Sequence, residues 1–139
     1  MPLKYQAEIN ALNPSFEGYS EVENKVAFRW TFEDINHPSN FLPVTKTNPS
    51  YKKAFEIFTG WALSFFETQD QSKARLKNLS EDKPRMYRKL GTHIAQGLLQ
   101  KNQGLCELQC DAHGHFNFFE NDGLDLIPHF KVIEQVGTL

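Results

Sequence analysis

The sequence lacks long apolar runs, and its longest strongly apolar stretch covers only residues 61–66. A helix that spans a membrane needs roughly 20 such residues. The residues that follow Met1 also lack the apolar core of a secretory signal peptide. These two absences predict a protein with no membrane span and no export signal.

Cysteine is scarce as well, with only Cys106 and Cys110 in the chain. On a single strand their Cα atoms would stand about 13 Å apart, at roughly 3.4 Å per residue. A disulfide needs Cα atoms about 4.4–6.8 Å apart. Two unpaired thiols are typical of a reducing compartment, so we expect a cytoplasmic location.

Motifs that carry common chemistries are also missing. The sequence contains no Walker A loop, no G-x-G-x-x-G and no H-E-x-x-H. Ser64 is not set in a nucleophile elbow, and it lies within a stretch of helical periodicity. The sequence therefore predicts no cofactor and favours a protein that is not an enzyme.

What is present is the composition of an ordinary globular domain. The chain has 139 residues, of which 40% are hydrophobic and 23% are charged. These values fit one core and a single domain over residues 1–139. Phenylalanine stands out with 12 residues. A buried ring stabilises a core by about 1.5–3 kcal/mol, although rings also mark pockets and interfaces.

Strand patterns occur near both ends of the chain. Apolar and polar residues alternate over 3–9 and, most clearly, over 26–32. Residues 105–118 predict a hairpin that turns at 111–114 and pairs Leu108 with Phe118. Residues 124–126 and 130–136 are further strand candidates, and the second of these could instead form a short helix.

Helical patterns occupy the middle of the chain. Apolar residues recur at steps of three and four over 49–66 and over 82–102, and a shorter polar helix is indicated at 72–78. We therefore expect an α+β fold. In it, an antiparallel sheet of N- and C-terminal strands carries a layer of two to three helices from the middle of the chain.

Basic charge is concentrated in the helical segment. Residues 46–101 hold 11 of the 15 Lys and Arg but only 5 of the 17 Asp and Glu. Arg85, Arg88 and Lys89 form a basic face on the expected helix, which could meet phosphates or an acidic protein surface. The net charge of −2 and the missing nucleic-acid motifs disfavour a nucleic acid as the partner.

The hairpin holds the densest group of chemically versatile side chains. Cys106, Cys110, His113 and His115 follow the spacing C-x3-C-x2-H-x-H, and these residue types bind zinc. In the expected register both cysteines face the core and His115 faces the other side, so we expect no metal. Asp111 is expected opposite His115 on the polar face, where the pair could serve acid–base chemistry.

These features favour a non-enzymatic interaction or regulatory module that binds another protein or a second copy of itself. The expected contacts come from the two long loops and the basic face. They are Phe16, Tyr19, Phe41, Leu42, Arg85, Arg88 and Lys89. One alternative is a small metal-dependent hydrolase that uses Asp111, His113 and His115. The other is a nucleic-acid-binding protein that uses the basic face.

Overall fold

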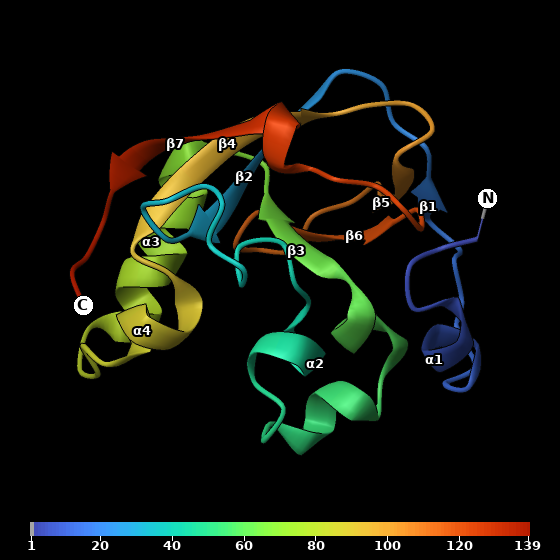
Figure 1. Ribbon diagram of the computed structural model, residues 1–139, viewed down its shortest axis with the longest axis horizontal. Helices are drawn as coiled ribbons and strands as arrows, with labels where there is room; N and C mark the ends of the chain where they lie inside the picture. The colour runs from blue at the N-terminus through green and yellow to red at the C-terminus, as the bar shows by residue number, and fades with distance from the viewer. Residues whose placement is uncertain (1) are drawn as a thin grey trace.

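The computed structural model describes residues 2–139 and has an α+β fold, as the sequence predicts. Its centre is a seven-stranded antiparallel sheet with the strand order β1-β5-β6-β3-β2-β4-β7 (Figure 1). The strands are β1 (Tyr19–Ser20), β2 (Lys25–Thr31), β3 (Leu63–Phe66), β4 (His93–Leu99), β5 (Gly104–Glu107), β6 (His115–Glu120) and β7 (Phe130–Gln135).

Short helices surround this sheet, and most of them come from the middle of the chain. The α-helices are α1 (Gln6–Asn10), α2 (Val44–Thr47), α3 (Gln69–Ser80) and α4 (Met86–Leu90), and the 3-10 helices are η1 (Lys52–Phe55), η2 (Phe58–Trp61) and η3 (Ile127–His129). Within residues 2–139, none of these helices has the length and apolarity needed to cross a membrane.

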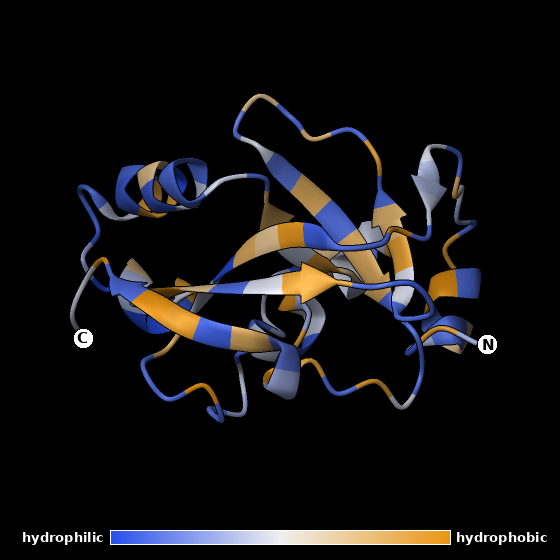
Figure 2. Ribbon diagram, turned by 90° about the horizontal axis from the view of Figure 1, so that it is seen from above, coloured by the Kyte–Doolittle hydropathy of each residue, from blue (hydrophilic) through white to orange (hydrophobic). Residues whose placement is uncertain are grey.

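The predicted strand at 26–32 is confirmed as β2, which lies inside the sheet between β3 and β4. Both of its faces are covered. Ala27 belongs to one core, and Phe28 belongs to a second core that includes Leu76 of α3. Apolar and polar residues alternate along the strands (Figure 2).

Arg29 of β2 is half-buried, and its side chain connects a long loop to the sheet. Its guanidinium donates to the carbonyl oxygens of Asn40 (2.7 Å), Leu42 (3.1 Å) and Ser64 (2.8 Å). Burial lowers the pKa of Arg29 to about 10, so the side chain stays charged at neutral pH. The loop over 34–43 is therefore fixed against β2 and β3.

The N-terminal alternation does not form a strand, and this prediction is wrong. Tyr5 has a positive φ of 65° and turns the chain into α1. Leu3 forms an isolated bridge with Asn121, and Ile9 is fully buried. The alternating pattern correctly identified Leu3 and Ile9 as buried. It did not determine the secondary structure, because a single helical turn buries Ile9 as completely as a strand would.

The predicted helix over 49–66 is also wrong. This segment forms η1, η2 and then β3. Gly60 packs so closely on Ala54 that a Cβ would overlap the Ala54 carbonyl oxygen, so the chain doubles back where the helix was expected. Phe65 and Phe66 then point to opposite faces of the sheet and enter different cores.

The predicted helix over 82–102 ends after one turn. Gly91 has a φ of 128°, and a Cβ there would lie 2.7 Å from the Thr31 carbonyl oxygen. The chain therefore leaves α4 at Gly91 and continues as β4. The polar helix predicted at 72–78 is confirmed as the longer α3, with the Thr68 hydroxyl accepting from the Gln71 N–H.

The hairpin forms with its turn at 111–114, and the Asp111 N–H donates to the His115 carbonyl oxygen at 2.9 Å, as the expected pairing requires. Farther from the turn, the register differs by two residues from the expected one. Cys106 pairs with Phe118, whereas the sequence predicted Leu108 there. The backbone N–H of Leu108 instead donates to the Gly18 carbonyl oxygen at 2.9 Å. As a result Leu108 and Cys110 are exposed, and only Cys106 faces the core.

The C-terminal segment settles two further predictions. Residues 130–136 were expected to form either a strand or a short helix, and they contain the strand β7. Residues 124–126 form no strand and instead lead into η3. Leu126 is buried in the same core as Phe130, so the apolar signal in this segment reflects burial in a loop.

Candidate functional site

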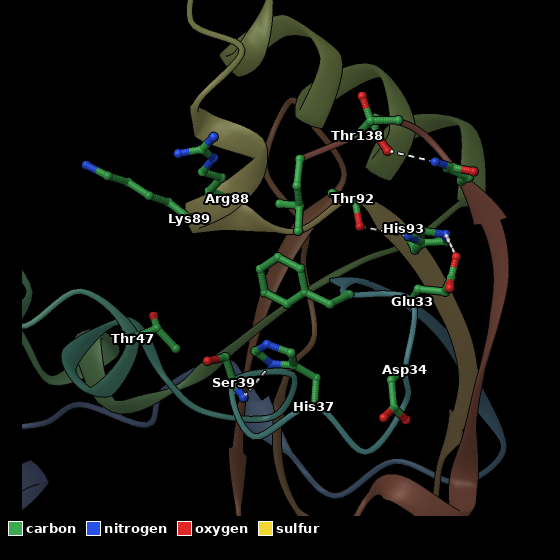
Figure 3. A pocket seen from close by; sticks show the side chains of 14 residues that line it. Glu33, Asp34, His37, Ser39, Thr47, Arg88, Lys89, Thr92, His93 and Thr138 are labelled. Carbon is green, nitrogen blue, oxygen red and sulfur yellow. Dashed lines mark hydrogen bonds and ion pairs between the residues drawn. The ribbon is translucent and has the colours of Figure 1, made fainter.

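A cleft of about 750 Å³ opens beside the end of β2 and the start of β4. Its walls come from the loop after β2, from α4, from the start of β4 and from the C-terminal residues (Figure 3). The sharp turn at Gly91 matters for this arrangement because it places α4 directly before β4. We refer to this site as the cleft.

The charges in the cleft are divided between its walls. Arg88 and Lys89 line it from α4, and both are exposed. Glu33 and Asp34 line it from the loop after β2, on the other side of His37 (Figure 3). A ligand in the cleft would therefore meet cationic and anionic groups at separate places.

Two histidines stand between these charges. His93 is buried, with its Nδ1 2.8 Å from the Thr92 hydroxyl and its Nε2 3.7 Å from a Glu33 carboxylate oxygen. The ring of His37 packs on Phe32 with a centroid distance of 4.5 Å. Both rings are held by neighbours rather than pointing freely into the cleft.

The structure thus brings two of the predicted basic residues to the cleft. Arg88 and Lys89 line it, whereas Arg85 lies outside it on the exposed start of α4. Because the helix stops at Gly91, the basic face is short and borders a defined hollow.

The aromatic residues predicted from the loops pack against the protein itself. Phe16 makes edge contacts with Phe58 and Phe119, at centroid distances of 5.8 and 5.3 Å. Tyr19 packs in the same cluster, and Phe41 packs on Phe130 at 5.4 Å. These three rings and Leu42 are half-buried, and their role in binding stays a prediction.

A second, smaller hollow of about 270 Å³ lies at the turn of the hairpin. We call it the hairpin hollow. Its lining residues are Trp30, Ser64, Phe66, Arg75, Leu79, Asp111, His113 and His115. A middle hollow of about 210 Å³ shares Ser64 with it and Lys89 with the cleft, so the three hollows adjoin.

The polar groups of the hairpin hollow are connected to one another. His115 Nε2 lies 2.9 Å from the Ser64 hydroxyl, and His115 Nδ1 lies 3.7 Å from Asp111 Oδ2. Asp111 Oδ1 accepts hydrogen bonds from the N–H groups of His113 (2.8 Å) and His115 (3.0 Å). The expected pair of Asp111 and His115 is therefore present, and Ser64 joins it.

Burial and charge set the ionisation of this group. Burial lowers the pKa of His115 below 6.5, and the charges of Arg29 and Arg75 act in the same direction, against Asp111 and Glu107. Partial burial would raise the pKa of Asp111, but hydrogen bonds from the backbone of His115 and His113 outweigh it and leave this pKa below 3.8. At neutral pH the imidazole of His115 is uncharged and the carboxyl group of Asp111 is ionised.

The four residues with zinc-like spacing do not converge. Cys106 is buried and Cys110 is exposed. Burial raises the pKa of Cys106 to about 11, so this thiol stays protonated and unreactive. Among residues 2–139, no three His, Cys, Asp or Glu side chains are grouped so that they could hold a metal ion.

Sequence reasoning missed Ser64 and the acidic wall of the cleft. Ser64 was assigned to a helix, although Leu63, Phe65 and Phe66 around it have strand-forming character and could have indicated β3. Glu33, Asp34 and His37 lie in or next to an irregular loop, where no periodic signal could have placed them together.

Comparison of the chain with protein-family models, with curated proteins and with solved structures finds no match. Function is therefore inferred from the geometry of the two sites.

Proposed function

We propose that this protein is an interaction module that binds an extended, acidic segment of another protein in the cleft. The observation that supports this is the pair of exposed cations, Arg88 and Lys89, on one wall of a cleft of about 750 Å³. Guanidinium and ammonium groups form charge-assisted hydrogen bonds with carboxylates, and Arg can bind them through two parallel bonds.

The edge of the sheet favours an extended ligand. β7 is the last strand of the sheet, and Gln135 at its end lines the cleft. Gly137 beyond it is already bonded, because its N–H donates to the Thr92 carbonyl oxygen and its own carbonyl oxygen accepts from the Gln135 side chain. An edge strand offers unpaired backbone N–H and C=O groups, to which a peptide can add as a further strand. A segment that pairs there would enter the cleft that Arg88 also lines.

The opposite wall selects against a nucleic acid. Glu33 and Asp34 would repel a continuous phosphate backbone, whereas a peptide can place a basic or neutral residue beside them. Divided charge therefore fits an extended segment whose acidic residues lie beside Arg88 and Lys89 and whose neutral or basic residues lie beside Glu33 and Asp34.

The free thiols support a cytoplasmic location for this interaction. Cys106 and Cys110 are both unpaired in the structure. Unpaired thiols persist in reducing compartments. We propose that the binding takes place in the cytoplasm.

A displayed library of random peptides tests the proposal. The purified protein should select peptides enriched in Asp and Glu. The double variant Arg88→Glu, Lys89→Glu should capture these peptides at least about tenfold less well, which corresponds to about 1.4 kcal/mol. The same measurement in 1 M salt should show weakened capture because exposed charges are screened.

The matched control is the double variant Lys52→Glu, Lys53→Glu. It changes the net charge by the same amount on exposed residues of η1, away from the cleft. Equal losses in both double variants would show that overall charge matters and the cleft does not. Selection of peptides without acidic enrichment would also contradict the proposal. Sedimentation of the protein alone distinguishes a partner protein from a second copy of the chain.

A further inference from the structure

The hairpin hollow contains a hydroxyl group, an imidazole and a carboxylate that contact one another in that order. These groups can serve as a nucleophile, its base and the group that orients the base. Ser64 lies on β3, His115 lies on β6, and Asp111 lies in the turn before β6. Ser64 pairs with Asn117 and Phe66 pairs with His115 across the two strands. Residues two apart on a strand share a face, so this register places Ser64 and His115 on the same face of the sheet.

We propose that Ser64, His115 and Asp111 form a catalytic site that hydrolyses small carboxylic esters in the hairpin hollow. The proposal concerns a different site from peptide binding in the cleft and does not depend on it. It also differs from a metal-dependent mechanism, because the reaction needs only these side chains and water.

The distances suit a base that takes the proton of the serine. The separation of 2.9 Å between the Ser64 hydroxyl and His115 Nε2 is within the range of about 2.6–3.2 Å required for a nucleophile and its base. With its proton on Nδ1, His115 presents a free electron pair at Nε2. The Asp111 carboxylate favours this tautomer because it lies on the Nδ1 side, at 3.7 Å.

Asp111 is fixed in place by the hairpin turn. Its Oδ1 accepts the N–H groups of His113 and His115, while its Oδ2 faces the imidazole. At 3.7 Å the carboxylate acts on the imidazole through its charge, so we treat Asp111 as a positioning residue. Ser64 and His115 are the catalytic residues.

The lining of the hollow defines the class of substrate. Trp30, Phe66 and Leu79 offer apolar surface for a short acyl chain. Arg75 brings a guanidinium to the same hollow, where it can stabilise the negative charge that develops on the ester oxygen. The volume of about 270 Å³ is slightly below the roughly 300–1,000 Å³ of sites for drug-sized molecules. A short-chain ester therefore fits best.

The reaction takes place in two balanced steps. The Ser64 oxygen bonds to the ester carbon, and His115 passes the serine proton to the departing alcohol as the carbon–alkoxy bond breaks. Water then attacks the acyl-serine and gives one proton to His115, which returns it to the Ser64 oxygen as that bond breaks. The products are an alcohol and a carboxylic acid.

A fluorophosphonate probe tests the site in the chain of 139 residues, because it reacts covalently with activated serines. Mass spectrometry of the labelled wild-type protein should place the adduct on Ser64. Replacing the base by His115→Asn should slow the labelling by about 100-fold or more, the usual contribution of a general base. Hydrolysis of p-nitrophenyl acetate should fall by a similar factor, whereas the octanoate ester should be a poor substrate of the wild-type protein.

Two variants separate catalysis from folding. Ser64→Ala should abolish labelling, while Ser15→Ala, which changes an exposed loop serine, should leave the labelling rate unchanged. Circular dichroism of each variant checks that it is folded. Because the adduct is mapped in the wild-type protein, a variant that fails to fold does not obscure the result. Absence of labelling, an adduct on another serine, or full activity of Ser64→Ala would overturn the proposal.

Discussion

In the cleft, the cationic side chains of one wall are unpaired, whereas in the hairpin hollow the polar side chains contact one another. Arg88 and Lys89 are exposed and make no salt bridge within residues 2–139. Asp111 instead contacts His115, and His115 contacts Ser64. Unpaired exposed charges are available to a partner, while a connected and partly buried group is already oriented for a reaction.

The sheet explains why the two regions differ. The hairpin hollow is built on the paired strands β3 and β6, whose register fixes the spacing of their side chains. The cleft combines a loop, one turn of helix and the C-terminal residues with the ends of two strands. Sites on paired strands are held more rigidly than sites on loops. This difference can be tested by changing a residue that supports both regions, then one residue of the hairpin hollow, then the protonation of His115.

The largest effect is expected at Arg29, because it supports both regions. Its guanidinium holds the loop over 34–43, which borders the cleft, and it also holds the carbonyl group of Ser64. Arg29→Met would leave these buried carbonyl groups without their donor. The free energy of unfolding should fall by about 3 kcal/mol, since each lost partner costs roughly 1–3 kcal/mol. Urea unfolding followed by circular dichroism measures the change.

Arg85→Met is the matched control for this variant. Arg85 is exposed at the start of α4, and its replacement should change the free energy of unfolding by less than about 0.5 kcal/mol. If both variants had the same stability, Arg29 would not be the link between the cleft and the hairpin hollow.

Asp111 should affect the hairpin hollow alone. Asp111→Ala removes the acceptor of two backbone N–H groups, so the free energy of unfolding should fall by about 1 kcal/mol. Asp111→Asn keeps an acceptor and should cost less, but it removes the charge beside His115. Both variants should slow labelling of Ser64, and neither should change peptide capture in the cleft. Loss of peptide capture in Asp111→Asn would mean that the two regions are coupled.

The contribution of Asp111 to the free energy of unfolding should decrease at acidic pH. The pKa of Asp111 is lowered by folding, so its contribution to stability is complete above the ordinary pKa of 3.8 and is lost as the pH falls through the lower value in the folded protein. Urea unfolding of the wild type between about pH 5 and about pH 2 should show this loss. Asp111→Asn should lack that part of the pH dependence.

The sequence was informative wherever local pattern and burial agree. The alternating pattern predicted β2 correctly because Val26, Phe28 and Trp30 share one face of a long strand. The polar face of the hairpin also follows from the alternation, which is why Asp111 and His115 could be paired in advance. The shift of the register farther from the turn could not be predicted, because there the N–H of Leu108 donates to Gly18 in the first loop, a contact between segments far apart in the sequence.

The two wrong helices share a physical cause. Aromatic and aliphatic residues at steps of three and four also fit a chain that turns sharply and then enters a strand buried on both faces. Gly60 and Gly91 make these turns because each packs against backbone where a Cβ would not fit. The close approach is a tertiary contact that neither glycine reveals in the sequence. Ser64 was hidden by the first of these errors, because a serine inside a helix would not face His115.

The smallest expected effect is a shift in the pKa of His115. This shift tests whether the charged groups around the hairpin hollow act on the imidazole. Burial, Arg29 and Arg75 lower the pKa of His115, while Asp111 and Glu107 raise it. Labelling of Ser64 needs the uncharged imidazole, so its rate should rise with pH through a midpoint below 6.5 and then stay constant. An NMR titration of the His115 ring should give the same midpoint without relying on activity. Asp111→Asn should move the midpoint to lower pH and Arg75→Met should move it to higher pH. Midpoints that stay unchanged in both variants would show that these charges do not reach the imidazole, and the contrast between a connected hollow and an open cleft would then fail.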